Sequence, residues 1–80
     1  MKTILEIEFK DAKEASQAAK ILKETKSDDE SLRAKIKVEA KKEKVTVIIT
    51  ATDFTALRAL TTTTLRDLKV IIDGFKITQN

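Results

Sequence analysis

Apolar and charged residues alternate near the start of the chain. The alternation extends from Ile4 to Phe9, with Leu5, Ile7 and Phe9 on one face and glutamates on the other. This period of two residues is typical of a β-strand with one buried face. We therefore predict a strand over these residues, with Ile4 as an apolar exception at its edge.

The next segment has the spacing of a helix. Asp11 stands where an N-cap residue is expected, and the stretch from Ala12 to Thr25 repeats alanine and leucine at intervals of three and four residues. Because alanine is small, this helix can lie close to a sheet. The polar, acidic stretch from Ser27 to Ser31 follows it and is predicted to be a mobile loop.

Two more alternating segments follow the loop. They extend from Leu32 to Ala40 and from Val45 to Ala51, with a turn over Lys41 to Lys44 between them. Because this turn contains neither Gly nor Asn, we do not predict a tight primed turn. The later strand is the most apolar, with Ile48 pointing outward, so we place it at the centre of the sheet.

These elements and a second helix predict an α+β fold in a single domain over residues 1–80. A right-handed crossover through the first helix leaves a gap between the first two strands, and the third strand fits into that gap antiparallel to both. The predicted architecture is a three-stranded antiparallel sheet of order 1-3-2 with two helices on one face, in the topology β-α-β-β-α.

The second helix is predicted from Phe54 or Thr55 to about Asp73, with Asp53 as its N-cap and Gly74 as its C-terminal stop. A helix of roughly 19 residues is about 28 Å long, whereas a typical strand measures ~17 to 20 Å. The helix is therefore longer than the sheet that it covers.

The apolar residues of this second helix fall into two stripes. The first stripe comprises Phe54, Leu57, Thr61, Leu68, Ile71 and Phe75. The second comprises Ala56, Leu60 and Ile72, with Leu65 on the border between the two. One stripe can cover the sheet, and the surplus predicts a surface for a partner.

The amino-acid composition excludes most kinds of catalytic site. The chain has no cysteine and no histidine, so thiolate metal sites and triads built on either residue are excluded. Gly74 is the only glycine, which excludes a phosphate-binding glycine-rich loop. No apolar run approaches the ~20 residues of a membrane span, and no signal-peptide core is present. We expect a cytoplasmic protein with no enzymatic activity, no cofactor and no membrane partner.

The segment from Asp53 to Arg66, DFTALRALTTTTLR, resembles a known family. The family is the Pcc family, the small dimerisation subunit of the KEOPS complex. Its last helix begins with an Asp, a hydrophobic residue and then Thr-Ala-Leu-Arg-Ala. Leu65 and Arg66 follow at the family's spacing. The chain departs from the family at Thr62 and Thr63, where Asn-Ser is usual, which leaves open a divergent paralogue.

The resemblance implies a non-catalytic subunit of a tRNA-modifying assembly. Such a subunit forms a homodimer, or a heterodimer with a paralogue, and docks onto the ATPase-like catalytic subunit that makes threonylcarbamoyladenosine in tRNA. The second helix would carry the contacts. The candidate partner-binding residues are Ala56, Arg58, Leu60, Thr61, Thr64 and Leu65.

Four consecutive threonines, Thr61 to Thr64, are unfavourable in the middle of a helix because β-branching restricts their side chains. Their hydroxyls can bond carbonyls one turn earlier and leave methyl groups for close packing. The run can therefore be a tolerated exposed stretch or core filler, or it can form part of the partner surface.

Six basic residues are candidates for contact with the tRNA backbone: Arg33, Lys35, Lys37, Lys41, Lys42 and Lys44. The first three project from the predicted open face of the sheet and the others crowd the adjoining turn. Lysines also protect an edge strand from aggregation, which explains them without any ligand. No aromatic residue lies on that face, so sequence-specific reading of RNA is not expected.

Two alternatives to the assembly subunit remain open from the sequence. The first is a free-standing RNA-binding α+β module that uses the basic sheet face, although the chain has no Gly-x-x-Gly loop. The second is a generic homodimer, which the departure at Thr62 and Thr63 permits.

Overall fold

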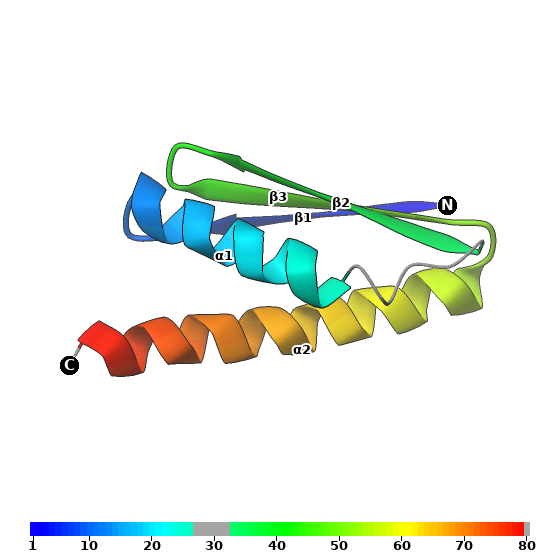
Figure 1. The fold of residues 1–80 in the computed structure, drawn as a ribbon. Helices are drawn as coiled ribbons and strands as arrows, with labels where there is room; N and C mark the ends of the chain where they lie inside the picture. Colours follow the sequence, from blue (N-terminus) through cyan, green and yellow to red (C-terminus); the bar gives the residue numbers. More distant parts are fainter. Residues whose placement is uncertain (27–32, 80) are drawn as a thin grey trace.

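The chain forms a three-stranded antiparallel sheet with both helices packed on one face, in a computed structural model that describes residues 1–26 and 33–79 (Figure 1). The predicted fold class and topology are confirmed. The elements in chain order are β1 (Lys2–Glu8), α1 (Ala12–Lys26), β2 (Ala34–Lys41), β3 (Lys44–Ala51) and α2 (Phe54–Gln79). The predicted mobile loop over 27–31 and the predicted strand start at residue 32 lie outside the described residues.

β3 lies at the centre of the sheet and pairs antiparallel with both neighbours, in the order β1-β3-β2. Val47 is opposite Leu5 of β1 and Val38 of β2. The inward side chains of β3 are fully buried, whereas Ile48 lies on the opposite face and is half-buried. The prediction that the most apolar strand is central is therefore confirmed.

The end of β1 differs from the prediction by one residue. Phe9 lies just beyond the strand, and its backbone N–H donates to the carbonyl of Glu43 over 2.7 Å. Its side chain is nevertheless buried in the core. The alternating pattern placed Phe9 on the correct face of the sheet. It could not show at which residue the backbone hydrogen bonds of the strand end.

The hairpin between β2 and β3 is tight, contrary to the prediction. Lys41 pairs with Lys44, so only Lys42 and Glu43 connect the strands. Lys42 takes a left-handed backbone conformation with φ of 56°. Glycine or asparagine is usual at such a position, so composition gave no sign of the turn.

Both helices begin at the predicted aspartates. The N–H of Glu14 donates to Asp11 over 2.8 Å, and the N–H of Ala56 donates to Asp53 over 2.8 Å. Each carboxylate thereby satisfies a backbone donor that the first turn of a helix leaves without an intrahelical acceptor. Ala15, Ala18 and Ala19 of α1 are buried against the sheet, as their size predicted.

α2 does not stop at Gly74, and this prediction is wrong. The helix continues to Gln79, and Gly74 does not have the positive φ of a helix-terminating glycine. Phe75, the next residue, packs edge-on against Phe9 with ring centroids 6.0 Å apart and an interplanar angle of 85°. Continuing the helix through Gly74 is what presents Phe75 to the core.

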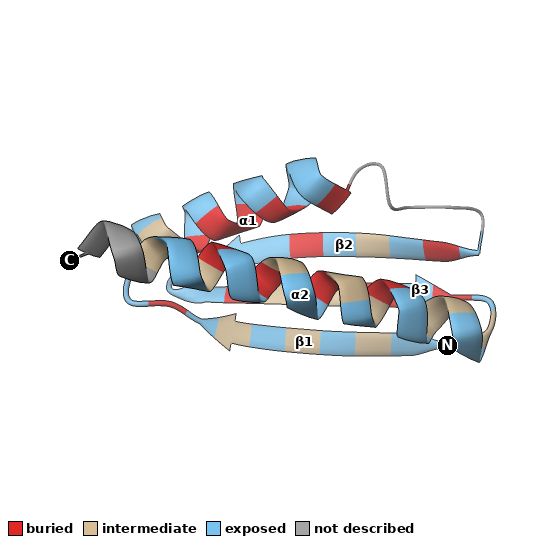
Figure 2. Cartoon of the chain, turned by 90° about the horizontal axis from the view of Figure 1, so that it is seen from below, coloured by how far each residue is buried: buried red, intermediate tan, exposed pale blue. Residues whose placement is uncertain are grey.

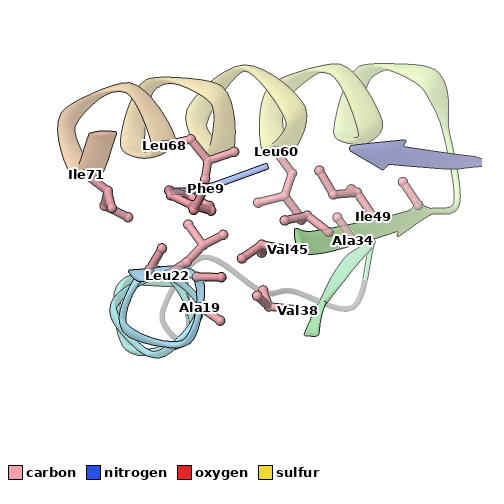
Figure 3. Close-up of a cluster of buried hydrophobic side chains, with 14 residues drawn as sticks. Phe9, Ala19, Leu22, Ala34, Val38, Val45, Ile49, Leu60, Leu68 and Ile71 are labelled. Carbon is pink, nitrogen blue, oxygen red and sulfur yellow. The ribbon is translucent and has the colours of Figure 1, made fainter. Parts of the chain in front are cut away.

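The core lies between the sheet and the two helices (Figure 3). Its buried hydrophobic residues come from α1, β2, β3, α2 and the β1–α1 connection, and Leu5 and Ile7 of β1 pack against them partly buried. The buried hydrophobic residues are Phe9, Ala15, Ala18, Ala19, Leu22, Ala34, Val38, Val45, Val47, Ile49, Ala51, Leu60, Leu68 and Ile71.

Candidate assembly surface

The face of α2 that packs on the sheet runs between the two predicted stripes and takes residues from both. Leu60, Thr64, Leu68 and Ile71 are buried there (Figure 2). Leu60 is 5% exposed and Thr64 is 0% exposed. These two residues therefore supply no surface for a partner, which corrects their inclusion among the candidate partner-binding residues.

An apolar flank of α2 stays exposed on the side away from α1. Phe54 is 63% exposed and Leu65 is 51% exposed, although both are large hydrophobic residues. Ile72 lies seven residues after Leu65, and seven residues return a helix to within about 20° of the same direction. The three residues therefore form one line along the helix.

This line lies above β1, because α1 occupies one side of α2 and β1 the other (Figure 2). The inward side chains Leu5 and Ile7 of β1 are only half-buried, whereas the inward residues of β3 are completely buried. We call the surface formed by Phe54, Leu65, Ile72, Leu5 and Ile7 the β1 flank. At this flank the hydrophobic core is only partly shielded from solvent.

The other candidate partner-binding residues take different positions. Ala56 and Thr61 are half-buried, and Arg58 is exposed. By helical geometry Arg58 lies about 20° from Leu65, since the two are seven residues apart. Arg58 therefore borders the β1 flank.

Two of the four threonines bond a carbonyl one turn earlier, as the sequence suggested. Thr63 donates to the carbonyl of Ala59 over 2.9 Å, and Thr64 donates to the carbonyl of Leu60 over 2.6 Å. The hydroxyl of Thr61 is buried and has no hydrogen-bond partner among the described residues. A buried polar group in that state is destabilising.

Replacing Thr61 by Val should stabilise the domain by about 1 kcal/mol, since the change removes a buried hydroxyl that makes no hydrogen bond and keeps the shape of the side chain. Urea unfolding followed by circular dichroism measures the change. The matched control is Thr64→Val, which removes a hydroxyl that is bonded, and it should be neutral or destabilising. A loss of stability in Thr61→Val would show that its hydroxyl is satisfied in solution.

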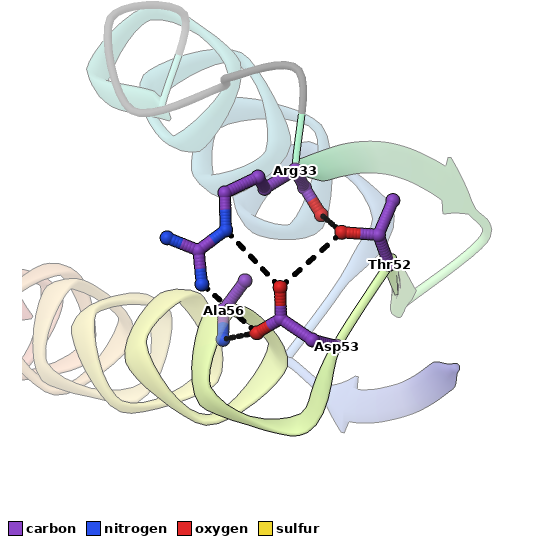
Figure 4. Close-up of polar contacts among 4 residues, drawn as sticks. All are labelled: Arg33, Thr52, Asp53 and Ala56. Carbon is purple, nitrogen blue, oxygen red and sulfur yellow. Dashed lines mark hydrogen bonds and ion pairs between the residues drawn. The ribbon is translucent and has the colours of Figure 1, made fainter.

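A polar cluster fixes the start of α2 to the start of β2 (Figure 4). Arg33 donates from Nε and Nη2 to the two carboxylate oxygens of Asp53, over 3.1 and 3.0 Å. The hydrogen bond from Arg33, followed by that from the N–H of Ala56, lowers the pKa of Asp53 to about 2. The backbone N–H of Thr52 also donates to the carbonyl of Arg33 over 2.8 Å. Arg33 thus has a structural role that does not require tRNA.

The six candidate tRNA-contacting residues do not form one continuous basic patch. Arg33 lies beside the start of β2, and the hairpin lysines lie around its other end, about 26 Å away at a rise of ~3.3 Å per residue. Between them, Lys37 pairs with Glu39 over 3.1 Å. At the hairpin, Lys44 pairs with Glu6 over 3.5 Å. Alternating charge weakens attraction to a phosphate backbone, and direct contact of the six basic residues with tRNA stays a prediction.

Two other kinds of feature, a metal centre and a membrane-spanning helix, are absent from the described residues. No group of three or more His, Cys, Asp or Glu residues in that part of the chain could hold a metal ion. Among residues 1–26 and 33–79, no helix combines the length and apolar character that crossing a membrane requires.

The fold defines a class of small β-α-β-β-α domains in which two helices cover one face of a three-stranded sheet. The sequence profile of the family described as "Transcription factor Pcc1" matches residues 2–75. The chain belongs to this family, whose members are subunits of the KEOPS complex, and the resemblance noted at Asp53 to Arg66 is thereby confirmed.

Comparison with solved structures supports the same fold. A chain of the crystal structure of the binary complex Gon7-Pcc1 matches with a TM-score of 0.85 and 21% sequence identity, over 98% of this chain and 95% of that chain. Comparison with curated proteins finds no match.

Proposed function

We propose that the protein is a non-catalytic, dimerising subunit of a KEOPS-type complex in the cytoplasm. It scaffolds the ATPase-like subunit that transfers the threonylcarbamoyl group during tRNA modification, and the chemistry takes place in that partner. Family membership supports a role as a KEOPS subunit. The dimer and the docking onto the catalytic subunit are the parts that experiment has to establish.

The observation that carries this proposal is the β1 flank. An 80-residue domain buries only about 60 to 65% of the surface of its unfolded chain, so its core benefits from completion by a partner. Here Phe54 and Leu65 remain more than half exposed beside half-buried residues of β1. Large apolar residues gathered at one flank are typical of an interaction surface. We assign dimerisation to this flank, and the other subunit of the dimer is a second copy of the chain or a paralogue.

The direct test is light-scattering mass after size exclusion, first with the protein alone and then with the ATPase-like subunit of the same organism. A dimer alone and a stable complex in the mixture are the expected results. A protein that never co-elutes with the catalytic subunit would contradict the docking. A dimer without co-elution would instead favour a paralogue or a dimer of another role.

Leu65→Asp should convert the dimer to a monomer at micromolar concentration without unfolding it. The side chain is 51% exposed in the monomer, so the carboxylate stays hydrated there, but dimerisation would remove its water. Sedimentation or light scattering measures the change in mass, and circular dichroism checks the fold.

The matched control is Val70→Asp, the same kind of change at a side chain that is 67% exposed and lies outside the β1 flank. It should leave the dimer intact. If Leu65→Asp remains as dimeric as the wild type, the dimer uses another surface and the assignment of the β1 flank is wrong.

A further inference from the structure

Phe54 occupies the end of the β1 flank at which α2 begins. It is the first residue of the helix, and its side chain is 63% exposed, so contacts of that side chain do little to fix its position. The ends of helices open more readily than their middles. The position of Phe54 therefore depends on what holds the backbone of the first turn of α2.

That first turn is held through Asp53. The carboxylate of Asp53 accepts from the backbone N–H of Ala56 over 2.8 Å, and its carbonyl accepts from the N–H of Leu57 over 3.1 Å. Arg33 binds both oxygens of the same carboxylate, over 3.1 and 3.0 Å (Figure 4). A bidentate pair of this kind fixes orientation as well as distance. Asp53 is therefore held between the start of β2 and the first turn of α2.

The backbone just before Asp53 is also bonded to both outer strands. The N–H of Thr52 donates to the carbonyl of Arg33 over 2.8 Å, and the N–H of Ala51 donates to the carbonyl of Met1 over 2.8 Å. These bonds hold the connection from β3 to α2, whereas the first turn beyond it relies on Asp53. The side chains of Arg33 and Asp53 are 62% and 42% exposed, so their pairing adds little to folding stability. Its main effect is on the position of the first turn.

We propose that Arg33 is a positioning residue for self-association: by holding Asp53, it keeps the first turn of α2 formed and presents Phe54 to the second subunit of the dimer. The inference rests on the proposed function, because Phe54 belongs to the flank to which dimerisation is assigned there. Without Arg33 the first turn opens part of the time, and the second subunit has to order it on binding. That ordering lowers the affinity although no contact across the interface is lost.

The test is Arg33→Gln, which removes the charge and the paired hydrogen bonds. The dissociation constant of the dimer, measured by sedimentation equilibrium, should rise about threefold to tenfold. The melting temperature of the monomer, measured in a Leu65→Asp background, should change by less than about 4 °C, because the pair is exposed. Asp53→Asn should weaken the dimer to the same extent, since asparagine caps a helix as well as aspartate does.

Lys37→Gln is the matched control. It removes the same charge and also breaks an exposed ion pair, with Glu39 at 3.1 Å, but Lys37 lies in β2, away from the β1 flank. The dissociation constant of the dimer should stay within about twofold of the wild-type value, because surface ion pairs of this kind contribute little. A rise equal to that of Arg33→Gln would show that net charge alone sets the affinity, which overturns the inference.

Phe54→Ala shows whether Arg33 acts through Phe54. This change should raise the dissociation constant about thirtyfold or more, as expected for a large aromatic residue at an interface. In the Phe54→Ala background, Arg33→Gln should change the dissociation constant by less than about twofold, because the side chain that it positions is gone.

The outcomes separate this inference from the proposed function. If the wild type is a monomer, the proposed dimer and the inference both fail. If Phe54→Ala dimerises as tightly as the wild type, the assignment of the β1 flank is wrong and the inference falls with it. If Phe54→Ala weakens the dimer and Arg33→Gln does not, only the inference is overturned. The same holds if Arg33→Gln acts equally with and without Phe54, or if it mainly lowers the melting temperature of the monomer.

Discussion

Asp67→Asn should lower the free energy of unfolding by about 3 to 5 kcal/mol, because it removes the carboxylate that balances a buried ammonium group. The side chain of Lys26 is 1% exposed and that of Asp67 is 25% exposed, so water screens the pair poorly. Against a typical total of about 5 to 15 kcal/mol, such a loss brings the domain close to unfolding at room temperature. Urea unfolding with an unchanged m-value measures it.

Two variants separate this ion pair from ordinary surface charge. Asp73→Asn makes the same chemical change at an exposed position of α2 and should alter stability by less than about 0.5 kcal/mol. The double variant Lys26→Met with Asp67→Leu replaces both charges by apolar groups and should recover most of the lost stability. A loss below about 1 kcal/mol in Asp67→Asn would show that Lys26 reaches solvent instead.

The ion pair joins the end of α1 to the middle of α2, on the side of α2 away from the β1 flank. Loosening the pair should therefore disturb the packing of α1 on α2 more than it disturbs the β1 flank.

The strands could be predicted from the sequence because a sheet with one buried face requires apolar and polar residues to alternate along each strand. Val45, Val47 and Ile49 are all fully buried, and the exposed Ile4 was correctly identified as the exception. The sheet order followed from the handedness of the crossover. The helix starts followed from Asp11 and Asp53, whose carboxylates accept the expected backbone hydrogen bonds.

The orientation of α2 could not be predicted, because Thr64 was counted as polar. Its hydroxyl bonds the carbonyl of Leu60, so it presents only a methyl group to the core. Counted as apolar, it would have completed the spacing Leu60, Thr64, Leu68 and Ile71 and identified the sheet-facing side. Phe54, the first residue of the first stripe, lies on the exposed flank.

Lys26 was missed for the same reason. It continues the spacing of Ala15, Ala19 and Leu22 along the buried side of α1, which was a signal that the residue is buried. A lysine on that side needs an acidic partner on the neighbouring helix. The sequence alone cannot select Asp67, because the angle between two helices depends on how both pack on the sheet.

Leu60→Asp should unfold the domain, although the residue belongs to the stripe from which a partner surface was predicted. Leu60 is 5% exposed and lies in the core with Leu68 and Ile71. The change removes a buried leucine and adds a carboxylate where water is excluded, at a combined cost of about 5 kcal/mol or more. Loss of the cooperative thermal transition, followed by circular dichroism, is the expected result.

Leu65→Asp, five residues further along the same helix, is the matched comparison because its side chain is half exposed. It should retain the thermal transition of the wild type and lose only the dimer. A pull-down would report lost binding for both variants, but only the loss in Leu65→Asp would identify an interface. If Leu60→Asp folded as well as the wild type, α2 would have turned its other stripe toward the sheet in solution, and Leu60 would return to the partner surface.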